Sequence, residues 1–118
     1  MATDTDELVS LLRALADPAR LRVIELLSAS PRRAGALAHE VGVDAPAMSK
    51  HLRVLLEAGV VVDERGAGDA RVRVFRLRGE SVGAVRAWLD QIQAHWAEQL
   101  ASFKAHVERE GRDEPGRR

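Results

Sequence analysis

Two apolar-periodic stretches separated by a very short turn limit most strongly what this chain can fold into. The pattern predicts a short helix over residues 33–41, ended by Gly42, the residue that most readily adopts the left-handed conformation at a helix end. Asp44 is then placed to cap a second helix over 45–58, whose first turn holds Pro46, where a missing N–H does no harm. We therefore expect two helices joined by a tight turn.

Two more helices are expected before this pair. Leucines recur at three-to-four spacing over residues 5–16, which is typical of one apolar helix face. Asp17 followed by Pro18 is an N-cap with proline at the first helical position, and it predicts a second helix that ends near Ser28. The N-terminal third of the chain is thus predicted to be helical.

The pattern changes after Gly59. Residues 60–62 are all valine, a loop with two glycines follows at 66–69, and the run RVRVFRL comes next. This β-branched content predicts two antiparallel strands joined as a hairpin. A long helix is expected from Ser81 or Val82 to Val107, so we predict a single domain over 1–107 and a flexible tail over 108–118.

Composition excludes several classes of protein. The chain has 118 residues, 46% of them hydrophobic, which suits one compact domain and argues against disorder as the main state. It has no cysteine, so a disulfide scaffold and a thiolate metal site are excluded. The acidic start MATDTDE is neither a basic leader nor an apolar segment. We expect no signal peptide, no membrane partner and a cytoplasmic location.

Charge is unevenly distributed along a chain whose 18 basic and 18 acidic residues cancel. Residues 65–78 contain five arginines and one acid, Asp69, a local charge of +4 (5 − 1). A neutral protein can therefore present a basic surface, as a binding partner of nucleic acid needs.

The predicted helix over 45–58 has an apolar side and a polar side. At 100° per residue, an inward arc holds Ala45, Met48, Leu52, Leu55 and Leu56, and an outward arc holds Pro46, Ser49, Lys50, Arg53 and Glu57. The N-terminal residues of such a helix meet base edges when it enters the major groove of DNA. As DNA-binding residues we therefore select Ala45, Pro46, Ser49, Lys50 and Arg53 of the helix, and Arg65, Arg71 and Arg73 of the hairpin, which are placed to contact phosphates.

Simpler interpretations stay open for several of these residues. A charged outward face is ordinary on solvated helices, and the basic hairpin is what favours DNA binding. The helical wheel places His51 beside Met48 and Leu55, which indicates a partly buried structural histidine. Arg76 and Arg78 leave the second strand on its other face and are not selected.

Three segments carry a resemblance to a known family. They are LRALADPARLRVIELL (12–27), LAHEVGVDAPAMSKHLRVLLEAGVV (37–61), in which SKHL is the most telling part, and the strand ending in VFRL. The chain resembles the ArsR family of winged helix-turn-helix transcriptional regulators. The resemblance implies a mainly α fold with a small two-stranded β-wing, a homodimer formed through the first and last helices, and repression at an inverted-repeat operator in double-stranded DNA. It also implies release by an effector, either a small molecule or a metal.

The resemblance raises a second hypothesis, a metal-responsive repressor. The family's cysteine site cannot exist here, and on the last helix only His95 and His106 have a suitable separation, too few ligands without a partner subunit. We predict no metal site and no cofactor. A third hypothesis is a winged-helix module that binds proteins and does not read DNA.

Catalysis is not expected. Ser49, Lys50 and His51 are consecutive, and consecutive residues of a helix do not face one another, so they cannot form a nucleophile–base pair. No catalytic residue is therefore assigned, and we predict that the chain is not an enzyme.

Overall fold

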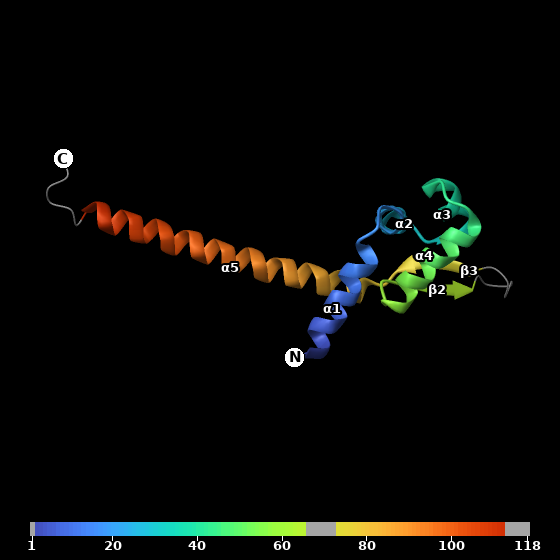
Figure 1. Cartoon of the computed structure of the whole chain (residues 1–118), viewed down its shortest axis with the longest axis horizontal. Coiled ribbons are helices and arrows are strands. Elements are labelled where there is room, and N and C mark those ends of the chain that lie inside the picture. Colours follow the sequence, from blue (N-terminus) through green and yellow to red (C-terminus); the bar gives the residue numbers. More distant parts are fainter. Residues whose placement is uncertain (1, 66–72, 113–118) are drawn as a thin grey trace. The chain divides into compact units, whose positions relative to one another are not determined.

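The computed structural model describes residues 2–65 and 73–112 of the chain (Figure 1). They fall into two compact units, residues 1–85 and 86–118, which are considered separately below. In chain order the elements are α1 (Ala2–Leu15), α2 (Pro18–Ala29), β1 (Arg32–Arg33), α3 (Ala34–Val41), α4 (Ala45–Glu57), β2 (Val61–Arg65), β3 (Arg73–Leu77) and α5 (Gly79–Arg112).

Side-chain capping starts α2 where the sequence predicted it. The Asp17 carboxylate accepts hydrogen bonds from the backbone N–H groups of Ala19 at 2.8 Å and Arg20 at 3.2 Å. These groups have no partner inside the helix, so the cap satisfies them. At the other end, Arg32 Nε donates to the Leu26 carbonyl at 3.3 Å.

The tight turn between α3 and α4 is also confirmed. Gly42 ends α3 with φ of 83°, and its N–H donates to the Ala38 carbonyl at 2.9 Å. Two residues later, Asp44 accepts from the N–H of Ala47 at 2.8 Å and starts α4. Gly59, with φ of 75°, follows the end of α4 and turns the chain into β2.

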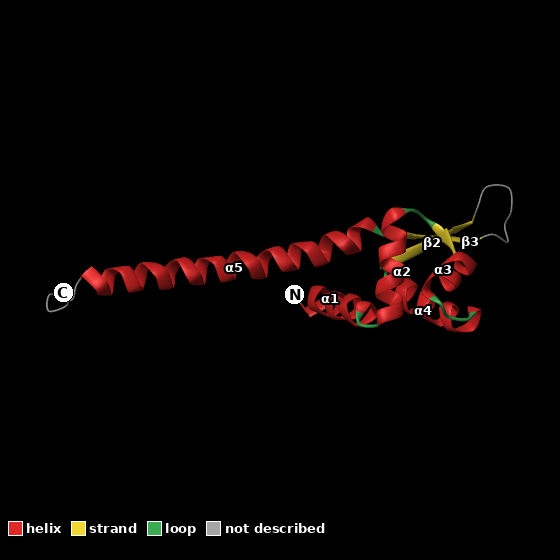
Figure 2. Ribbon diagram, turned by 90° about the horizontal axis from the view of Figure 1, so that it is seen from above, coloured by secondary structure: helices red, strands yellow, loops and turns green. Residues whose placement is uncertain are grey.

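The sheet has one strand more than the sequence predicted. Strands β2 and β3 pair antiparallel as expected (Figure 2). Strand β1 adds to the other side of β3, which gives the order β1-β3-β2. The register pairs Arg32 with Phe75 and Arg33 with Val74. The two-stranded wing is therefore part of a three-stranded sheet that ties the start of α3 to the wing.

The first unit is organised around one apolar core. Val23, Leu37 and Leu55, from α2, α3 and α4, are fully buried, and Phe75 brings in the sheet. Burial of these side chains is the main force that holds the helices and the sheet together. The full set of buried residues is Leu11, Ala14, Val23, Leu26, Leu27, Leu37, Ala38, Met48, Leu52, Leu55, Val60, Val61 and Phe75.

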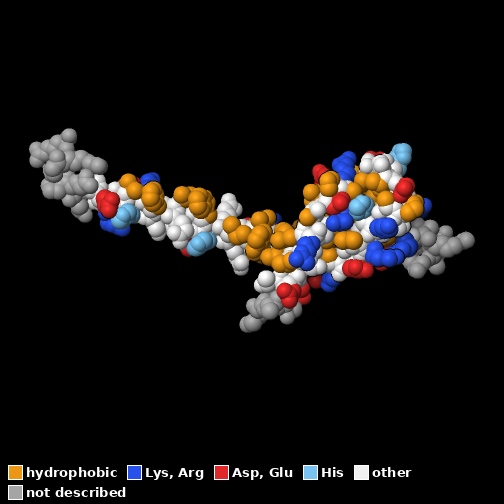
Figure 3. All heavy atoms as spheres, in the orientation of Figure 1, with side chains coloured by type: hydrophobic (Ala, Val, Ile, Leu, Met, Phe, Trp, Pro, Cys, Tyr) orange, Lys and Arg blue, Asp and Glu red, His pale blue; other side chains and the backbone are white. Residues whose placement is uncertain are grey.

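Helix α5 is longer than predicted at both ends. It begins at Gly79 and continues through 108–112, the residues with which the predicted tail began. Residues 113–118 lie outside the described part. A row of hydrophobic side chains along α5 is exposed (Figure 3), and it consists of Val82, Leu89, Ile92, Trp96, Leu100, Phe103 and Val107. Among the described helices, α5 included, none is long and apolar enough to cross a membrane.

Candidate nucleic-acid interface

Helix α4 separates its apolar and polar residues sharply. Met48, Leu52 and Leu55 are at most 3% exposed and belong to the core. Five residues on the other side are all exposed, and we call them the outward face of α4: Ala45, Pro46, Ser49, Lys50 and Arg53. Ala45 differs from the helical wheel, which placed it on the inward arc: it is the first residue of α4 and is exposed.

Both cations of the outward face lack an acidic partner within the described part of the chain. Neither Lys50 nor Arg53 makes an ion pair with any other residue that the structure describes. An exposed cation without an acidic partner is free to bind a phosphate group of a ligand. The outward face of α4 therefore presents a hydroxyl and two cations to solvent, from Ser49 to Arg53 in the middle of the helix.

Arg20, on α2, makes polar contacts with both α1 and α4. Its Nε donates to the Ala14 carbonyl of α1 at 2.5 Å, and its Nη1 lies 3.4 Å from Nδ1 of His51 on α4. His51 is half-buried, as the sequence predicted. The contact helps to orient α4, because polar contacts are directional whereas apolar packing is not.

Asp17, the N-cap of α2, carries a negative charge near Arg20 and His51. Hydrogen bonds from the backbone N–H groups of Arg20 and Ala19, followed by the nearby charges of Arg20 and His51, hold the pKa of the Asp17 carboxyl below its usual value. The N-cap of α2 is therefore an ionised carboxylate at neutral pH.

The outward face of α4 and the wing meet at a shallow hollow of about 370 Å³. Three residues selected from the sequence, Ser49, Arg53 and Arg73, line it together. Its other lining residues are Ala34, Leu52, Leu56 and Phe75. The structure thus brings residues 20 or more positions apart in the sequence, Arg53 and Arg73 among them, to one concave surface.

Arg73 is already occupied within the wing. Its Nε and Nη2 donate to Oδ2 of Asp63 at 2.9 and 2.6 Å, and its guanidinium lies 5.2 Å from the centre of the Phe75 ring. Arg65 ends β2, where its backbone pairs with that of Arg73. Arg71 lies outside the described residues. Asp63 is not among the residues selected from the sequence, because the charge count covers only 65–78 and Asp63 lies just before that range, on the strand that pairs with Arg73.

Comparison with known proteins identifies the architecture. Residues 15–64 match a family described as a helix-turn-helix domain. The HTH-type transcriptional regulator Rv2034 of Mycobacterium tuberculosis is 37% identical over 101 residues, which are 86% of this chain and 89% of that protein. A solved ArsR-like transcriptional regulator from Rhodococcus sp. RHA1 matches with a TM-score of 0.74 and 28% identity, over 89% of this chain and 95% of that one. This chain belongs to the ArsR family of winged helix-turn-helix regulators.

A second solved structure adds the assembly of one relative. The homodimeric winged helix-turn-helix DNA-binding domain Mb0332 of Mycobacterium bovis matches with a TM-score of 0.64 and 26% identity, over 83% of this chain and 88% of that one. That protein is described as a possible ArsR-family transcriptional regulator. The ArsR family is thus a family of transcriptional regulators and not of enzymes.

The histidines of α5 do not form a ligand cluster in this ArsR chain by itself. His106 Nε2 lies 3.2 Å from Oε1 of Glu110, one turn further along α5, and both side chains are largely exposed. Over residues 2–65 and 73–112, no three His, Cys, Asp or Glu side chains come together as metal ligands. The metal-responsive hypothesis therefore depends on ligands from a second subunit.

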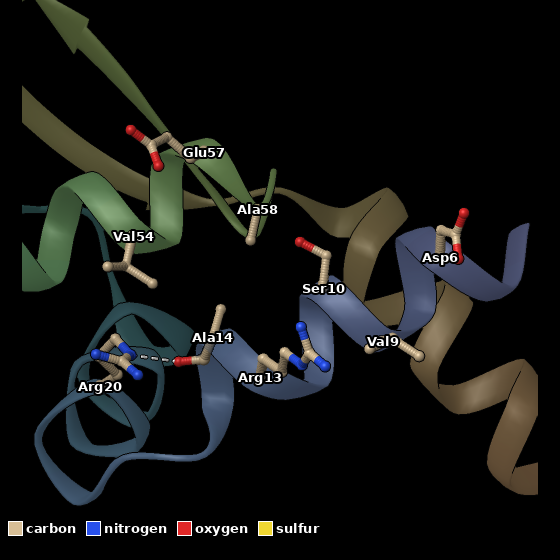
Figure 4. A pocket seen from close by; sticks show the side chains of 9 residues that line it. All are labelled: Asp6, Val9, Ser10, Arg13, Ala14, Arg20, Val54, Glu57 and Ala58. Carbon is tan, nitrogen blue, oxygen red and sulfur yellow. Dashed lines mark hydrogen bonds between the residues drawn. The ribbon is translucent and has the colours of Figure 1, made fainter. Parts of the chain in front are cut away.

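A larger hollow, of about 610 Å³, lies between α1 and α4 (Figure 4). Arg13 and Arg20 line it together with Asp6 and Glu57, so its charges balance. In Figure 4 the Arg20 side chain is held at one side by its hydrogen bond to Ala14. Its balanced charge does not favour binding of a DNA phosphate. The hollow beside the wing differs, because two arginines and no acidic residue line it.

Proposed function

We propose that this ArsR-family protein is a homodimeric repressor that binds an inverted-repeat operator in double-stranded DNA through the outward face of α4. One observation carries the proposal. The outward face presents a hydroxyl, Ser49, and two cations, Lys50 and Arg53, that have no ion-pair partner among the described residues, on a helix whose opposite side is buried in the core. That is the arrangement in which a recognition helix enters the major groove.

The residues divide into two kinds of DNA contact. Ala45, Pro46, Ser49, Lys50 and Arg53 are proposed to meet base edges and the adjoining phosphates, because they occupy the end of α4 that leads into the groove. Arg65, Arg71 and Arg73 are proposed to contact the phosphate backbone from the wing. Only the first group would then distinguish one DNA sequence from another.

The exposed row of α5 supports the homodimer. Leu89, Trp96 and Phe103 are between 52% and 68% exposed, and they repeat at seven-residue intervals along the helix. Such a row on a helix is covered by another apolar surface in stable proteins. We propose a second copy of α5 as that surface, and the relative from Mycobacterium bovis is homodimeric. A twofold dimer presents two copies of α4, which suits an inverted repeat.

The proposal includes no catalytic role, a cytoplasmic location where chromosomal DNA is present, and an effector that remains to be identified. An effector that binds the DNA-free form better than the DNA-bound form would release the operator. Metals and small molecules can be screened for release once the operator is known.

The test is fluorescence anisotropy of the purified protein with labelled DNA from upstream of its own coding region, at physiological salt. We expect binding that survives an excess of unrelated duplex and weakens as salt is raised. If neither this DNA nor any duplex from a random pool is selected, the proposal is wrong. A salt-independent complex with a protein partner would then favour the protein-interaction module.

Single alanine variants test the outward face. Replacing Ser49, Lys50 or Arg53 by alanine should each weaken operator binding about tenfold, or about 1.4 kcal/mol, which lies within the range for a lost base contact. Arg22→Ala is the matched control, because Arg22 is an exposed cation on α2 and does not line the hollow beside the wing. Loss of affinity in the control equal to that in the Arg53 variant would contradict the assignment.

A further inference from the structure

Among the described residues, the wing carries two ion pairs, and they lie on opposite faces of the hairpin. Asp63 binds Arg73 at 2.6 Å, and Glu64 binds Arg76 at 2.6 Å. Each pair joins β2 to β3, and the two acids are consecutive in the sequence. Because successive side chains of a strand point to opposite faces, the two pairs cannot share a face.

The Asp63–Arg73 pair lies on the face that points to α4. Asp63 is opposite Phe75 in the register, and Phe75 is 2% exposed within the core. Arg73 shares this face and lines the hollow together with Ser49 and Arg53 of α4. Glu64 is opposite Val74, so its pair with Arg76 lies on the face away from this hollow. Only one of the two pairs adjoins the outward face of α4.

Stability does not explain the pair beside the hollow. The side chains of Arg73 and Asp63 are 49% and 40% exposed, and ion pairs this exposed contribute little to folding. Their geometry has a different consequence. Asp63 accepts hydrogen bonds from Nε and Nη2 of Arg73. These are two donors that an arginine can use together to bind a phosphate in a bidentate geometry.

We propose that Asp63 is an internal competitor of DNA phosphate for Arg73, and that it sets the affinity of this protein for duplex DNA. The inference rests on the proposed function, since it concerns the same surface. Asp63 holds the guanidinium that would otherwise neutralise a phosphate of the DNA backbone. Lys50 and Arg53, which have no acidic partner among the described residues, then carry a larger share of the attraction.

Phosphates are the same in every sequence, so the effect of Asp63 does not depend on sequence. Removing its charge should strengthen binding to the operator and to unrelated duplex by a similar factor. Because Asp63 competes for Arg73 in the parent, its removal should make the slope of log affinity against log salt steeper by up to about 0.9, the value for one full phosphate contact. The gain in affinity should therefore be up to roughly threefold larger at 50 mM than at 200 mM salt.

The experiment compares Asp63→Asn with Glu64→Gln in the full chain. Both substitutions remove one negative charge, keep the size of the side chain and break one wing ion pair, and they differ in the face on which they act. Anisotropy titrations with operator and with unrelated duplex are run between 50 and 200 mM salt. We expect tighter binding and a steeper slope for Asp63→Asn, and the parent slope for Glu64→Gln.

A third variant, Asp63→Asn combined with Arg73→Ala, tests whether the gain passes through Arg73. It should lose the added slope. Equal slopes for Asp63→Asn and Glu64→Gln, or a gain that survives in the double variant, would overturn the inference and leave the proposed function intact. A parent protein that binds no duplex at any salt concentration would overturn both, so the two failures are distinguishable.

Discussion

The two units of this chain treat their apolar residues in opposite ways. In the first unit Val23, Leu37 and Leu55 are fully buried. In the second unit, which is the later part of α5, Trp96 and Phe103 are 62% and 68% exposed. The first unit therefore has a hydrophobic core of its own. The second unit has exposed apolar side chains that no other described element covers.

This difference separates the determinants of folding from those of assembly. Most of the stability of a helix in a protein comes from packing of its apolar face, and α5 has an exposed one. The first unit should fold without a partner and present the outward face of α4. The second unit should control whether two copies of α4 act on one DNA duplex.

The largest effect is expected from a cavity in the core of the first unit. Leu55→Ala removes a fully buried side chain of α4 and should lower the free energy of unfolding by about 3 kcal/mol. Val54→Ala is the matched control on the same helix, because Val54 is 37% exposed, and it should cost less than about 1 kcal/mol. Urea unfolding followed by circular dichroism measures both. Equal losses would contradict the contrast between the two sides of α4.

The next effect concerns the second unit. Phe103→Ala should weaken dimerisation by about 2 kcal/mol, a roughly thirtyfold rise in the dissociation constant, because a large aromatic side chain leaves the proposed interface. Lys104→Ala changes the neighbouring exposed residue on α5 and should have little effect. Sedimentation equilibrium measures the two constants. If both variants dimerise like the parent, the apolar row of α5 is not the interface.

Sequence reasoning located the elements that carry their own local signals. Asp17 with Pro18 and Gly42 with Asp44 marked helix ends correctly, because caps act within three residues of their own position. The polar and apolar sides of α4 followed from its period for the same reason. Local chemistry was enough for the helix-turn-helix and for most of the proposed DNA surface.

Features that depend on contacts across the chain were not predictable in this way. Strand β1 has two residues and exists through its pairing with β3, so it has no period to detect. Asp63 is ten residues from Arg73, and only the register of the hairpin brings them together. The end of α5 was placed at Val107, where the apolar row stops, although the backbone continues as helix to Arg112.

The smallest effect is a pH dependence confined to the first unit. The pKa of Asp17 is lowered in the folded chain, chiefly by the backbone N–H of Arg20, so the ionised carboxylate stabilises the fold above its unfolded pKa. This stabilisation should disappear as pH falls through the folded pKa. Asp17→Asn keeps an N-cap acceptor and removes the charge, so the parent should unfold at higher urea than the variant at pH 7.

The two proteins should converge between about pH 5 and pH 2, since protonated aspartic acid and asparagine are both neutral caps. Urea midpoints of parent and variant, measured in parallel over this range, isolate Asp17 from all other carboxyls, which titrate equally in both. The dimer dissociation constants of parent and variant should stay equal at pH 7, because the cap lies in α2 and not on the apolar row of α5. A midpoint difference that is independent of pH would mean that the charge of Asp17 does not stabilise the first unit.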